Sequence, residues 1–208
     1  KKNYKVSNIK TFILNFIPYL NLDCIKNFEY FKKIYNIKKN FIYIPNQFWK
    51  HKNHSILIDC AKILKRKNYP VKFVITGNPS LNSFNSIYSN FVNKIQKYGL
   101  TEYFHLLGFV PYTHVVNLIY HSKILINPSL FEGWSTTVEE GKILKKKMIL
   151  SSIKVHKDQA KSEAVFFNPK NAVDLSKKII QLNKIKIEKK NLNKLKKIFL
   201  NKRILFAQ

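Results

Sequence analysis

The chain has 208 residues, which fits one α/β domain with short attachments and excludes a second full-sized hydrophobic core. Its formal net charge of +27 suggests nucleic acid or an anionic membrane as a partner, since a strong positive field drives non-specific binding to both. The lysines are scattered, however, and accompany an excess of Asn and Ile over Ala and Gly. Compositional drift on solvated faces is therefore the alternative explanation of the charge.

Two sequence features bear on the cellular compartment. Cys24 and Cys60 are far apart, and Cys60 lies on the apolar face of a predicted helix, which indicates reduced thiols and a cytosolic location. The apolar run at residues 11–22 contains two Asn and one Pro and is too short to span a bilayer. The Lys-rich residues before this run, together with the run itself, resemble a signal peptide, but neither an initiating Met nor a small-residue cleavage site is present. We therefore expect no membrane span and no cleaved leader.

Short apolar runs rich in β-branched and aromatic residues alternate with stretches at helical spacing. The predicted strands are residues 11–16, 41–45, 71–77, 104–107, 123–127, 148–151 and 164–167. The predicted helices are residues 25–35, 56–64, 84–95, 113–121, 138–144, 171–182 and 184–206. His156 falls in a predicted loop. This alternation predicts a Rossmann-like, doubly wound parallel α/β sheet, whose ligands bind at the carboxyl ends of its strands.

Residues 131–141 connect a predicted buried strand to a predicted helix. A loop that leaves the carboxyl end of a parallel strand and enters a helix presents unpaired backbone N–H groups and the positive end of the helix dipole. Gly133 lets the backbone of this loop approach a ligand closely. The sequence therefore predicts a phosphate site here.

Two carboxylates, Glu132 and Glu140, frame this loop with seven residues between them. A third, Glu139, fits a capping box in which Thr136 is the N-cap and Glu139 is the third helical residue, although a role as a ligand group is the alternative. Acidic residues beside an anion site are unfavourable unless the ligand also brings hydrogen-bond donors, such as sugar or ribose hydroxyls. A nucleotide sugar supplies both phosphate and hydroxyls.

These residues carry a resemblance to a known family. Residues 128–134, with Glu140 eight positions after Glu132, resemble the Glu-x7-Glu signature of retaining glycosyltransferases of the GT-B fold, specifically glycosyltransferase family 4. Three other segments fall in the order expected for that family, namely residues 46–54, 108–111 and 155–159. The resemblance covers about residues 38–183.

The resemblance implies a division of the chain into three parts. Residues 38–183 would be the C-terminal, nucleotide-sugar-binding half of a GT-B enzyme, residues 1–37 the end of the N-terminal acceptor domain with its linker, and residues 184–208 a basic C-terminal helix. The acceptor half is missing, so we expect the chain alone to transfer no sugar. The apolar stripe of the last helix would be covered by that missing half or would dock on a membrane, and comprises Leu192, Leu195, Ile198, Phe199 and Leu205.

The resemblance also implies roles for individual residues. Lys52 and the N–H groups of the loop would stabilise the charge that builds on the diphosphate, and Glu132 would orient the hydroxyls of the transferred sugar. Glu140 would accept hydrogen bonds from the ribose. Gln47 stands where the family usually has Arg, so a neutral amide replaces a bidentate charged contact.

We expect two catalytic residues, Lys52 and Glu132. The full set expected to contact the donor substrate is Gln47, Lys52, Val110, Glu132, Gly133, Trp134, Ser135, Thr136 and Glu140. Backbone groups rather than side chains are expected to act at Val110, beside the nucleotide base, and at Trp134.

We expect neither a metal nor a cofactor besides the donor substrate. His51 and His54 suggest a metal pair, but a third and a fourth ligand are not evident, and GT-B enzymes generally need no metal for catalysis. His156 and Gln159 belong to a Val-His-x-x-Gln element that is expected to organise a loop rather than to react. The chain contains no Ser-His-Asp constellation, Cys-x-x-Cys pair or Walker loop.

The expected function is transfer of a hexose from a nucleoside diphosphate sugar to a glycan or lipid-linked acceptor, with retention, in surface polysaccharide or glycolipid synthesis. The expected location is the cytoplasm, with peripheral attachment to the inner face of the membrane as an extension. A GT-B-type epimerase or phosphorylase is a related alternative. A basic nucleic-acid-binding module is an alternative of another class, supported by charge alone, and we do not expect nucleic acid as a partner.

Overall fold

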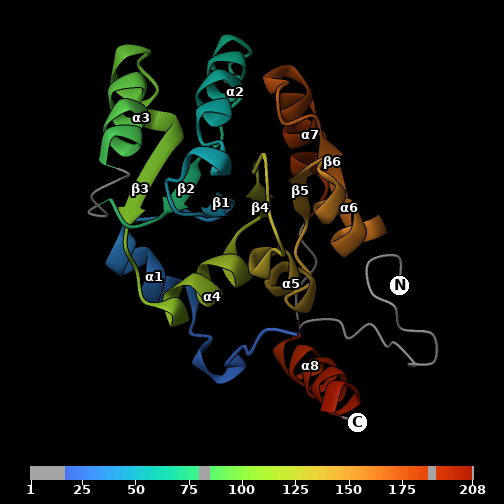
Figure 1. The fold of residues 1–208 in the computed structure, drawn as a ribbon. Helices are drawn as coiled ribbons and strands as arrows, with labels where there is room; N and C mark the ends of the chain where they lie inside the picture. Colours follow the sequence, from blue (N-terminus) through green and yellow to red (C-terminus); the bar gives the residue numbers. More distant parts are fainter. Residues whose placement is uncertain (1–16, 80–84, 187–190, 208) are drawn as a thin grey trace, which may run out of the picture.

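The computed structural model describes residues 17–79, 85–186 and 191–207. Six parallel strands form one sheet in the order β3-β2-β1-β4-β5-β6 (Figure 1). Their bounds are β1 Ile42–Pro45, β2 Phe73–Thr76, β3 Phe104–Gly108, β4 Ile124–Asn127, β5 Met148–Ser151 and β6 Ala164–Phe167. This order confirms the predicted doubly wound α/β fold. It reverses between β1 and β4, and ligands of such sheets bind outside the carboxyl ends of the strands at that reversal.

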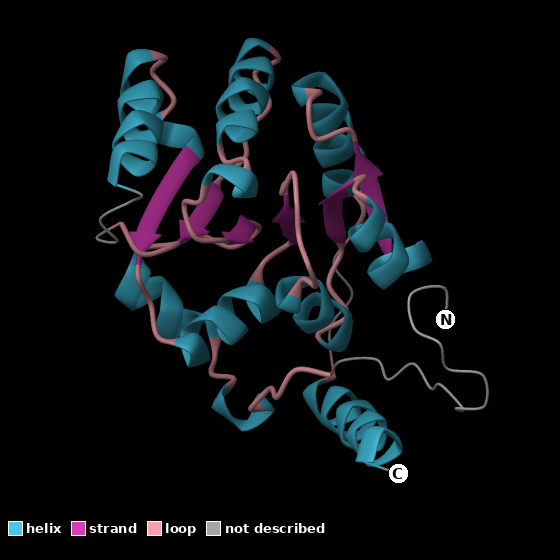
Figure 2. Ribbon diagram, viewed as in Figure 1, coloured by secondary structure: helices cyan, strands magenta, loops and turns pink. Residues whose placement is uncertain are grey.

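Helices cover both faces of the sheet (Figures 1 and 2). One face carries α2 Ser55–Arg66, α3 Asn85–Lys97 and α7 Ala172–Lys184. The other face carries α1 Phe28–Tyr35, α4 Tyr112–His121 and α5 Thr136–Ile143. The short helix α6 Lys154–Ala160 precedes β6, and α8 Leu192–Ala207 ends the described chain. Short 3-10 turns lie at Leu22–Cys24, Lys50–Lys52, Thr101–Tyr103 and Lys161–Glu163.

The strands are buried on both faces because each strand side contacts its own hydrophobic core. Successive side chains of a strand point to opposite faces. Accordingly, Ile42 and Ile44 of β1 belong to the core under α2, α3 and α7, whereas Phe41 and Tyr43 belong to the core under α1, α4 and α5. This double burial explains why the strands read as continuous apolar runs rather than as alternating ones.

The segment before β1 packs on the sheet's second face. The predicted strand at residues 11–16 lies outside the described residues, and the helix predicted at residues 25–35 begins at Phe28, where the side chain of Asn27 accepts a hydrogen bond from the N–H of Glu29. Phe28 and Phe31 are buried in the core that also contains α4. This segment is therefore packed against the same core as β1.

The predicted basic helix near the C-terminus is present as α8. Its Leu195 and Phe199 are buried, and Phe199 belongs to the same core as α1 and α5. Lys196 Nζ lies 2.5 Å from a carboxylate oxygen of Asp23. The apolar stripe of this helix was expected to be covered by the missing half of the enzyme or by a membrane. That expectation is wrong for Leu195 and Phe199, which are buried within this chain.

The segment around His156, predicted to be a loop, is the helix α6. Its buried residues, His156, Gln159 and Ala160, follow one another at a spacing of three and then one residue. Two of these three are polar, so hydrophobic periodicity does not reveal them. The buried contacts of these side chains help to stabilise helix α6, as tertiary packing does for most short helices.

Replacing Gly77 with alanine is expected to destabilise the fold by about 1–3 kcal/mol. An added Cβ would lie 2.8 Å from the backbone oxygen of Asn46 and 3.2 Å from a ring carbon of Phe48. Gly133→Ala is the matched control, because its Cβ would meet nothing within 4 Å, and it should change stability by less than about 0.5 kcal/mol. Urea unfolding measures both free energies, and equal losses in the two variants would contradict this packing argument.

Candidate active site

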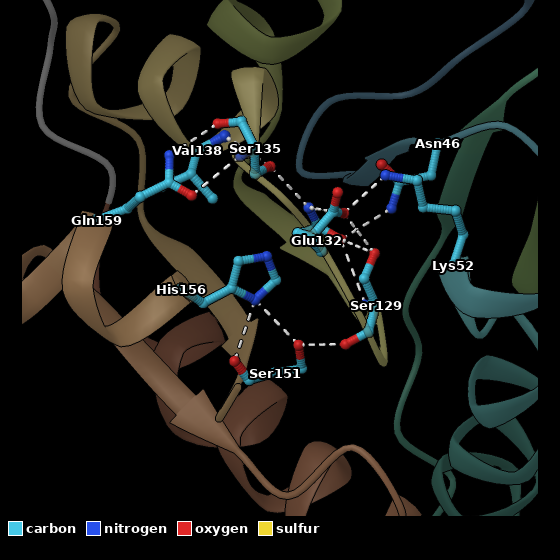
Figure 3. Close-up of polar contacts among 10 residues, drawn as sticks. Asn46, Lys52, Ser129, Glu132, Ser135, Val138, Ser151, His156 and Gln159 are labelled. Atoms are coloured by element: carbon cyan, nitrogen blue, oxygen red, sulfur yellow. Dashed lines mark hydrogen bonds and ion pairs between the residues drawn. The ribbon is translucent and has the colours of Figure 1, made fainter. Parts of the chain in front are cut away.

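Most of the predicted site residues follow the carboxyl ends of β1 and β4, which are neighbours in the sheet, whereas Val110 follows β3 and Glu140 lies within α5. Figure 3 shows side chains that converge there from the segment after β1, the segment after β4 with the start of α5, the end of β5, and α6. The two loops touch directly, since the N–H of Leu130 donates to the backbone oxygen of His51 at 2.7 Å. The switch point of the sheet is thus where the sequence placed the phosphate loop.

Glu132 is anchored through one carboxylate oxygen. Its Oε1 accepts from Lys52 Nζ at 2.7 Å, from Ser129 Oγ at 2.7 Å and from Asn127 Nδ2 at 3.3 Å. Its Oε2 accepts a hydrogen bond from no residue that the structure describes. The side chains of Lys52 and Glu132 are only 14% and 8% exposed. One oxygen is thereby fixed while the other can accept hydrogen bonds from a ligand.

The contacts of Glu132 also set its charge. Burial alone would raise the pKa of this carboxyl, but the hydrogen bonds and positive charge of Lys52, together with the donors of Ser129 and Asn127, hold the pKa below its ordinary value. Glu132 is therefore ionised at neutral pH and is a strong hydrogen-bond acceptor.

Asn127, the last residue of β4, organises this group. It is fully buried, and its Nδ2 donates to Ser135 Oγ at 3.0 Å as well as to Glu132. Its Oδ1 accepts from Asn46 Nδ2 at 3.1 Å and from the backbone N–H of Ser129 at 3.3 Å. Sequence reasoning did not single out Asn127, although an amide at the end of a wholly apolar strand is a signal that could have found it. One side chain thus ties both loops to the start of α5.

Helix α5 begins one residue earlier than the capping box requires. Its N-cap is Ser135, whose side chain accepts from the N–H of Val138 at 3.4 Å, so Thr136 is the first helical residue and Glu139 the fourth. The predicted capping box is therefore wrong. Because Asn127 donates to Ser135 Oγ, a tertiary contact favours Ser135 over Thr136 as the cap. Glu139 instead pairs with Lys142 at 3.1 Å.

Gln159 of α6 clamps the N-cap residue through the backbone. Its Oε1 accepts from the N–H of Ser135 at 3.0 Å, and its Nε2 donates to the Ser135 carbonyl oxygen at 3.1 Å and to Glu139 Oε1 at 3.0 Å. The N–H of Ser135 is therefore not free for phosphate, which corrects the expectation that every N–H from Gly133 to Thr136 serves the ligand. The N–H groups of Gly133, Trp134 and Thr136 donate to no residue that the structure describes.

Gln47 and Val110 lie in a neighbouring cavity of about 250 Å³. The segments after β1, β2 and β3 form its walls, and it is lined by Pro45, Asn46, Gln47, Thr76, Gly77, Phe109, Val110, Tyr112 and Val115. Gln47 Oε1 accepts from the N–H of Asn78 at 2.7 Å, so this side chain ties two walls of the cavity together. Its replacement of Arg thus has a structural use as well as lowering the local positive charge.

Glu140 contacts Tyr112, a residue that lines this cavity, rather than the Lys52–Glu132 pair. It is 5% exposed, and its Oε1 accepts from the hydroxyl of Tyr112 at 2.7 Å. Burial raises the pKa of Glu140, and the hydrogen bond from Tyr112 opposes that rise. The two carboxylates of the sequence signature therefore have different partners, Lys52 for Glu132 and Tyr112 for Glu140.

The histidines have separate surroundings. His54 is buried and stacks on Phe48 with ring centroids 4.3 Å apart, and burial lowers its pKa to about 3, whereas the ring of His51 faces Phe131. Within the described ranges, no three His, Cys, Asp or Glu side chains gather as a metal site would require.

The ring of His156 contacts Ser151, as Figure 3 shows. Its Nδ1 lies 2.9 Å from Ser151 Oγ and 3.1 Å from the Ser151 carbonyl oxygen. Ser151 Oγ donates to the carbonyl oxygen of Ser129 at 2.5 Å, so its single proton is already committed. The proton of His156 is therefore on Nδ1. The histidine holds Ser151 at the end of β5, and the Ser151 hydroxyl in turn holds the backbone of Ser129. No step that reacts with substrate is needed to explain it.

The strand order and the site at the switch point define the chain as a doubly wound domain that matches one half of the GT-B glycosyltransferase fold. It belongs to the glycosyl transferases group 1 family, whose model matches residues 26–198. The match begins before residue 38 and includes α1.

Solved structures share this fold at low sequence identity. A glycosyltransferase from Rickettsia africae superposes with a TM-score of 0.67 at 22% identity, over 86% of this chain and 46% of that one. A UDP-forming α,α-trehalose-phosphate synthase from Burkholderia xenovorans gives 0.63 at 12% identity, over 82% and 45% of the two chains. The Escherichia coli trehalose-6-phosphate protein bound with UDP-2-fluoro glucose gives 0.62 at 12% identity, over 86% and 43%.

The chain therefore spans less than half the length of these solved structures. No curated protein matches the sequence significantly. Among the described helices, none combines the length and apolarity that crossing a bilayer requires.

Proposed function

We propose that the chain is the donor-binding half of a retaining family 4 glycosyltransferase, and that it transfers a hexose from a nucleoside diphosphate sugar. The observation that carries this proposal is the position of Lys52, Glu132 and the start of α5 around one point at the switch of the sheet. An ammonium group, an ionised carboxylate and unpaired backbone N–H groups are what a sugar diphosphate needs.

The diphosphate is the leaving group, and its developing charge is the main electrostatic demand. Lys52 Nζ and the N–H groups of Gly133, Trp134 and Thr136 can meet this demand, because these N–H groups have no partner in the described part of the chain. Donors fixed before the reaction stabilise the developing charge without reorganisation. We assign no protein nucleophile.

The sugar is oriented by Glu132. Because its Oε1 is held by three donors, its Oε2 keeps a fixed position from which it accepts hydrogen bonds from sugar hydroxyls. This arrangement also explains the ion pair, since Lys52 is needed both to hold Glu132 and to face the phosphate. The proposal involves no metal or further cofactor.

The nucleoside lies in the 250 Å³ cavity, with its base near the backbone of Val110 and its ribose toward Glu140. UDP is the first donor nucleotide to test, because one solved structure of the same fold is named for UDP-2-fluoro glucose and another is named UDP-forming. GDP is the second, since the four polar side chains that line the cavity already hydrogen-bond within the protein, namely Asn46, Gln47, Thr76 and Tyr112.

The acceptor is proposed to bind a second half of the enzyme that precedes this chain, in agreement with the lengths of the solved structures. We propose a glycan or lipid-linked acceptor in surface polysaccharide or glycolipid synthesis, at the inner face of the membrane. The exposed apolar side chains Leu200 and Ile204 of α8, beside its lysines, support peripheral attachment. An epimerase or phosphorylase of the same fold remains the related alternative.

Substitutions of the two adjacent glutamates test the register of the site. Glu140→Ala in the full-length enzyme is expected to weaken nucleoside diphosphate binding by about 10- to 100-fold, since hydrogen bonds to a charged group contribute about 1.5–3 kcal/mol. Glu139→Ala is expected to lower stability by about 1 kcal/mol and to leave affinity nearly unchanged, because its carboxylate contacts Lys142 and Gln159.

Isothermal titration with UDP and GDP, together with urea unfolding, distinguishes the two variants. Loss of the nucleotide in Glu139→Ala but not in Glu140→Ala would show that the wrong carboxylate has been assigned. Absence of binding by the wild-type enzyme would contradict the proposed function itself.

A further inference from the structure

Tyr112 occupies a position that the sequence signature does not account for. It is the first residue of α4, directly after the N-cap Pro111, and it lines the 250 Å³ cavity. Its side chain is half-exposed, although its hydroxyl reaches inward to the buried Glu140. Tyr112 therefore joins the open cavity to a carboxylate that does not itself line that cavity.

The direction of this hydrogen bond is fixed. Burial and the neighbouring Glu140 raise the pKa of the Tyr112 hydroxyl well above its ordinary value, so the phenol keeps its proton at neutral pH. A carboxylate oxygen can only accept, so the phenol donates to Glu140 Oε1 at 2.7 Å. The phenol oxygen then has only lone pairs left to offer, and a group in the cavity must donate to it.

The same contact limits what Glu140 can do. Its Oε1 is occupied by Tyr112, and its Oε2 accepts from no described residue. A ligand in the cavity meets the half-exposed phenol before it meets a carboxylate that is 5% exposed. The two oxygens nearest to the ligand, one phenolic and one carboxylate, are therefore both acceptors.

We propose that Tyr112 is a specificity-determining residue of the donor site, and that its phenol oxygen accepts a hydrogen bond from a ribose hydroxyl of the nucleotide. This inference rests on the proposed function, since it names the group that reads the sugar of the nucleoside. Ribose carries two neighbouring hydroxyl donors, which match the pair formed by Tyr112 and Glu140. A deoxyribose leaves one of these acceptors without a donor, and such unpaired groups oppose binding.

The test is isothermal titration of the full-length enzyme with UDP and GDP and with their 2′-deoxy and 3′-deoxy forms. The wild type is expected to bind the ribonucleotide at least about 10-fold more tightly than one of the deoxy forms, the effect of one good hydrogen bond. Tyr112→Phe is expected to lose most of this preference while its affinity for inorganic pyrophosphate stays within about 2-fold.

Tyr98→Phe is the matched control. Tyr98 is 37% exposed and lies between the end of α3 and the start of β3, whereas the cavity lies at the carboxyl ends of the strands and Tyr98 does not line it. It is expected to keep the wild-type preference for ribose. Circular dichroism during thermal unfolding checks that both variants are folded.

The possible results distinguish a failure of the proposed function from a failure of the role assigned to Tyr112. If neither UDP nor GDP binds the wild type, the proposed function fails and this inference fails with it. If the wild type binds ribo- and deoxyribonucleotides equally, Tyr112 accepts no hydrogen bond from a ribose hydroxyl, and the inference is wrong whatever the result for the variant. If the wild type discriminates and Tyr112→Phe keeps the full preference, Glu140 or another group reads the ribose and the assignment of Tyr112 is wrong.

Discussion

Replacing Lys52 with alanine is expected to lower kcat/KM for sugar transfer by the full-length enzyme by about 100- to 1000-fold, the cost of removing one preorganised electrostatic group. Lys52 contributes twice, because its ammonium faces the proposed diphosphate and also holds Glu132 through a contact of 2.7 Å. The variant leaves the Glu132 carboxylate 8% exposed and without its cation, so some stability is lost as well.

Lys50→Ala is the control for this experiment. Lys50 lies in the same 3-10 turn as Lys52 but is exposed to solvent, so its removal changes the net charge equally without changing the pair. Kinetics with a saturating acceptor separate the two variants, and unfolding measurements detect any loss of the folded fraction. A Lys52→Ala enzyme that keeps more than a tenth of the wild-type kcat/KM would remove Lys52 from the mechanism.

Asn127→Asp is expected to destabilise the fold by about 3 kcal/mol or more at neutral pH. The substitution changes shape very little, but it replaces a buried donor with a carboxylate oxygen 3.3 Å from Glu132 Oε1 and 3.0 Å from Ser135 Oγ. Burial and the neighbouring Glu132 raise the pKa of the new carboxyl above its unfolded value. The destabilisation is therefore largest when that carboxyl is ionised and shrinks as the pH falls and the carboxyl becomes protonated.

Asn171→Asp supplies the matched control. Asn171 is the N-cap of α7 and uses its side-chain oxygen to accept from the N–H of Asp174, a role that aspartate performs equally well. Urea unfolding at several pH values compares the two variants. A loss in Asn127→Asp that does not depend on pH would show that the buried charge is not the cause.

Most of the fold was predictable because the strands are buried on both faces. The runs at residues 148–151 and 164–167 match β5 and β6 residue for residue, and residues 123–127 contain all of β4. Continuous apolar runs between helical stretches are specific to this architecture. The local sequence was therefore sufficient to predict those strands whose position depends on the burial of apolar side chains.

Prediction failed where polar side chains make tertiary contacts. Ser135 and Thr136 are both acceptable N-caps in isolation, and the hydrogen bond from the Asn127 amide to Ser135 Oγ favours Ser135. Gln159 lies 24 positions away in the sequence, yet its Oε1 accepts from the N–H of Ser135 and its Nε2 donates to the Ser135 carbonyl oxygen. No spacing rule encodes such a partner, so the loop was located correctly while the assignment of its N–H groups was wrong in part.

The different partners of the two signature carboxylates could not be predicted from the sequence. Sequence spacing places Glu132 and Glu140 symmetrically about the loop, yet Glu132 faces Lys52 while Glu140 faces Tyr112. Burial moves the pKa of Glu140 upward, whereas ion pairing moves that of Glu132 downward. Their different chemistry follows from these neighbours and not from the motif.

A crystal structure of the full-length enzyme with bound UDP, or with GDP if that nucleotide binds more tightly, is the most direct test of the account. The account predicts the diphosphate within hydrogen-bond distance of Lys52 Nζ and the N–H of Thr136, with the ribose at Tyr112 and Glu140. A nucleotide bound away from the carboxyl ends of β1 and β4, with the Lys52–Glu132 pair untouched, would contradict it.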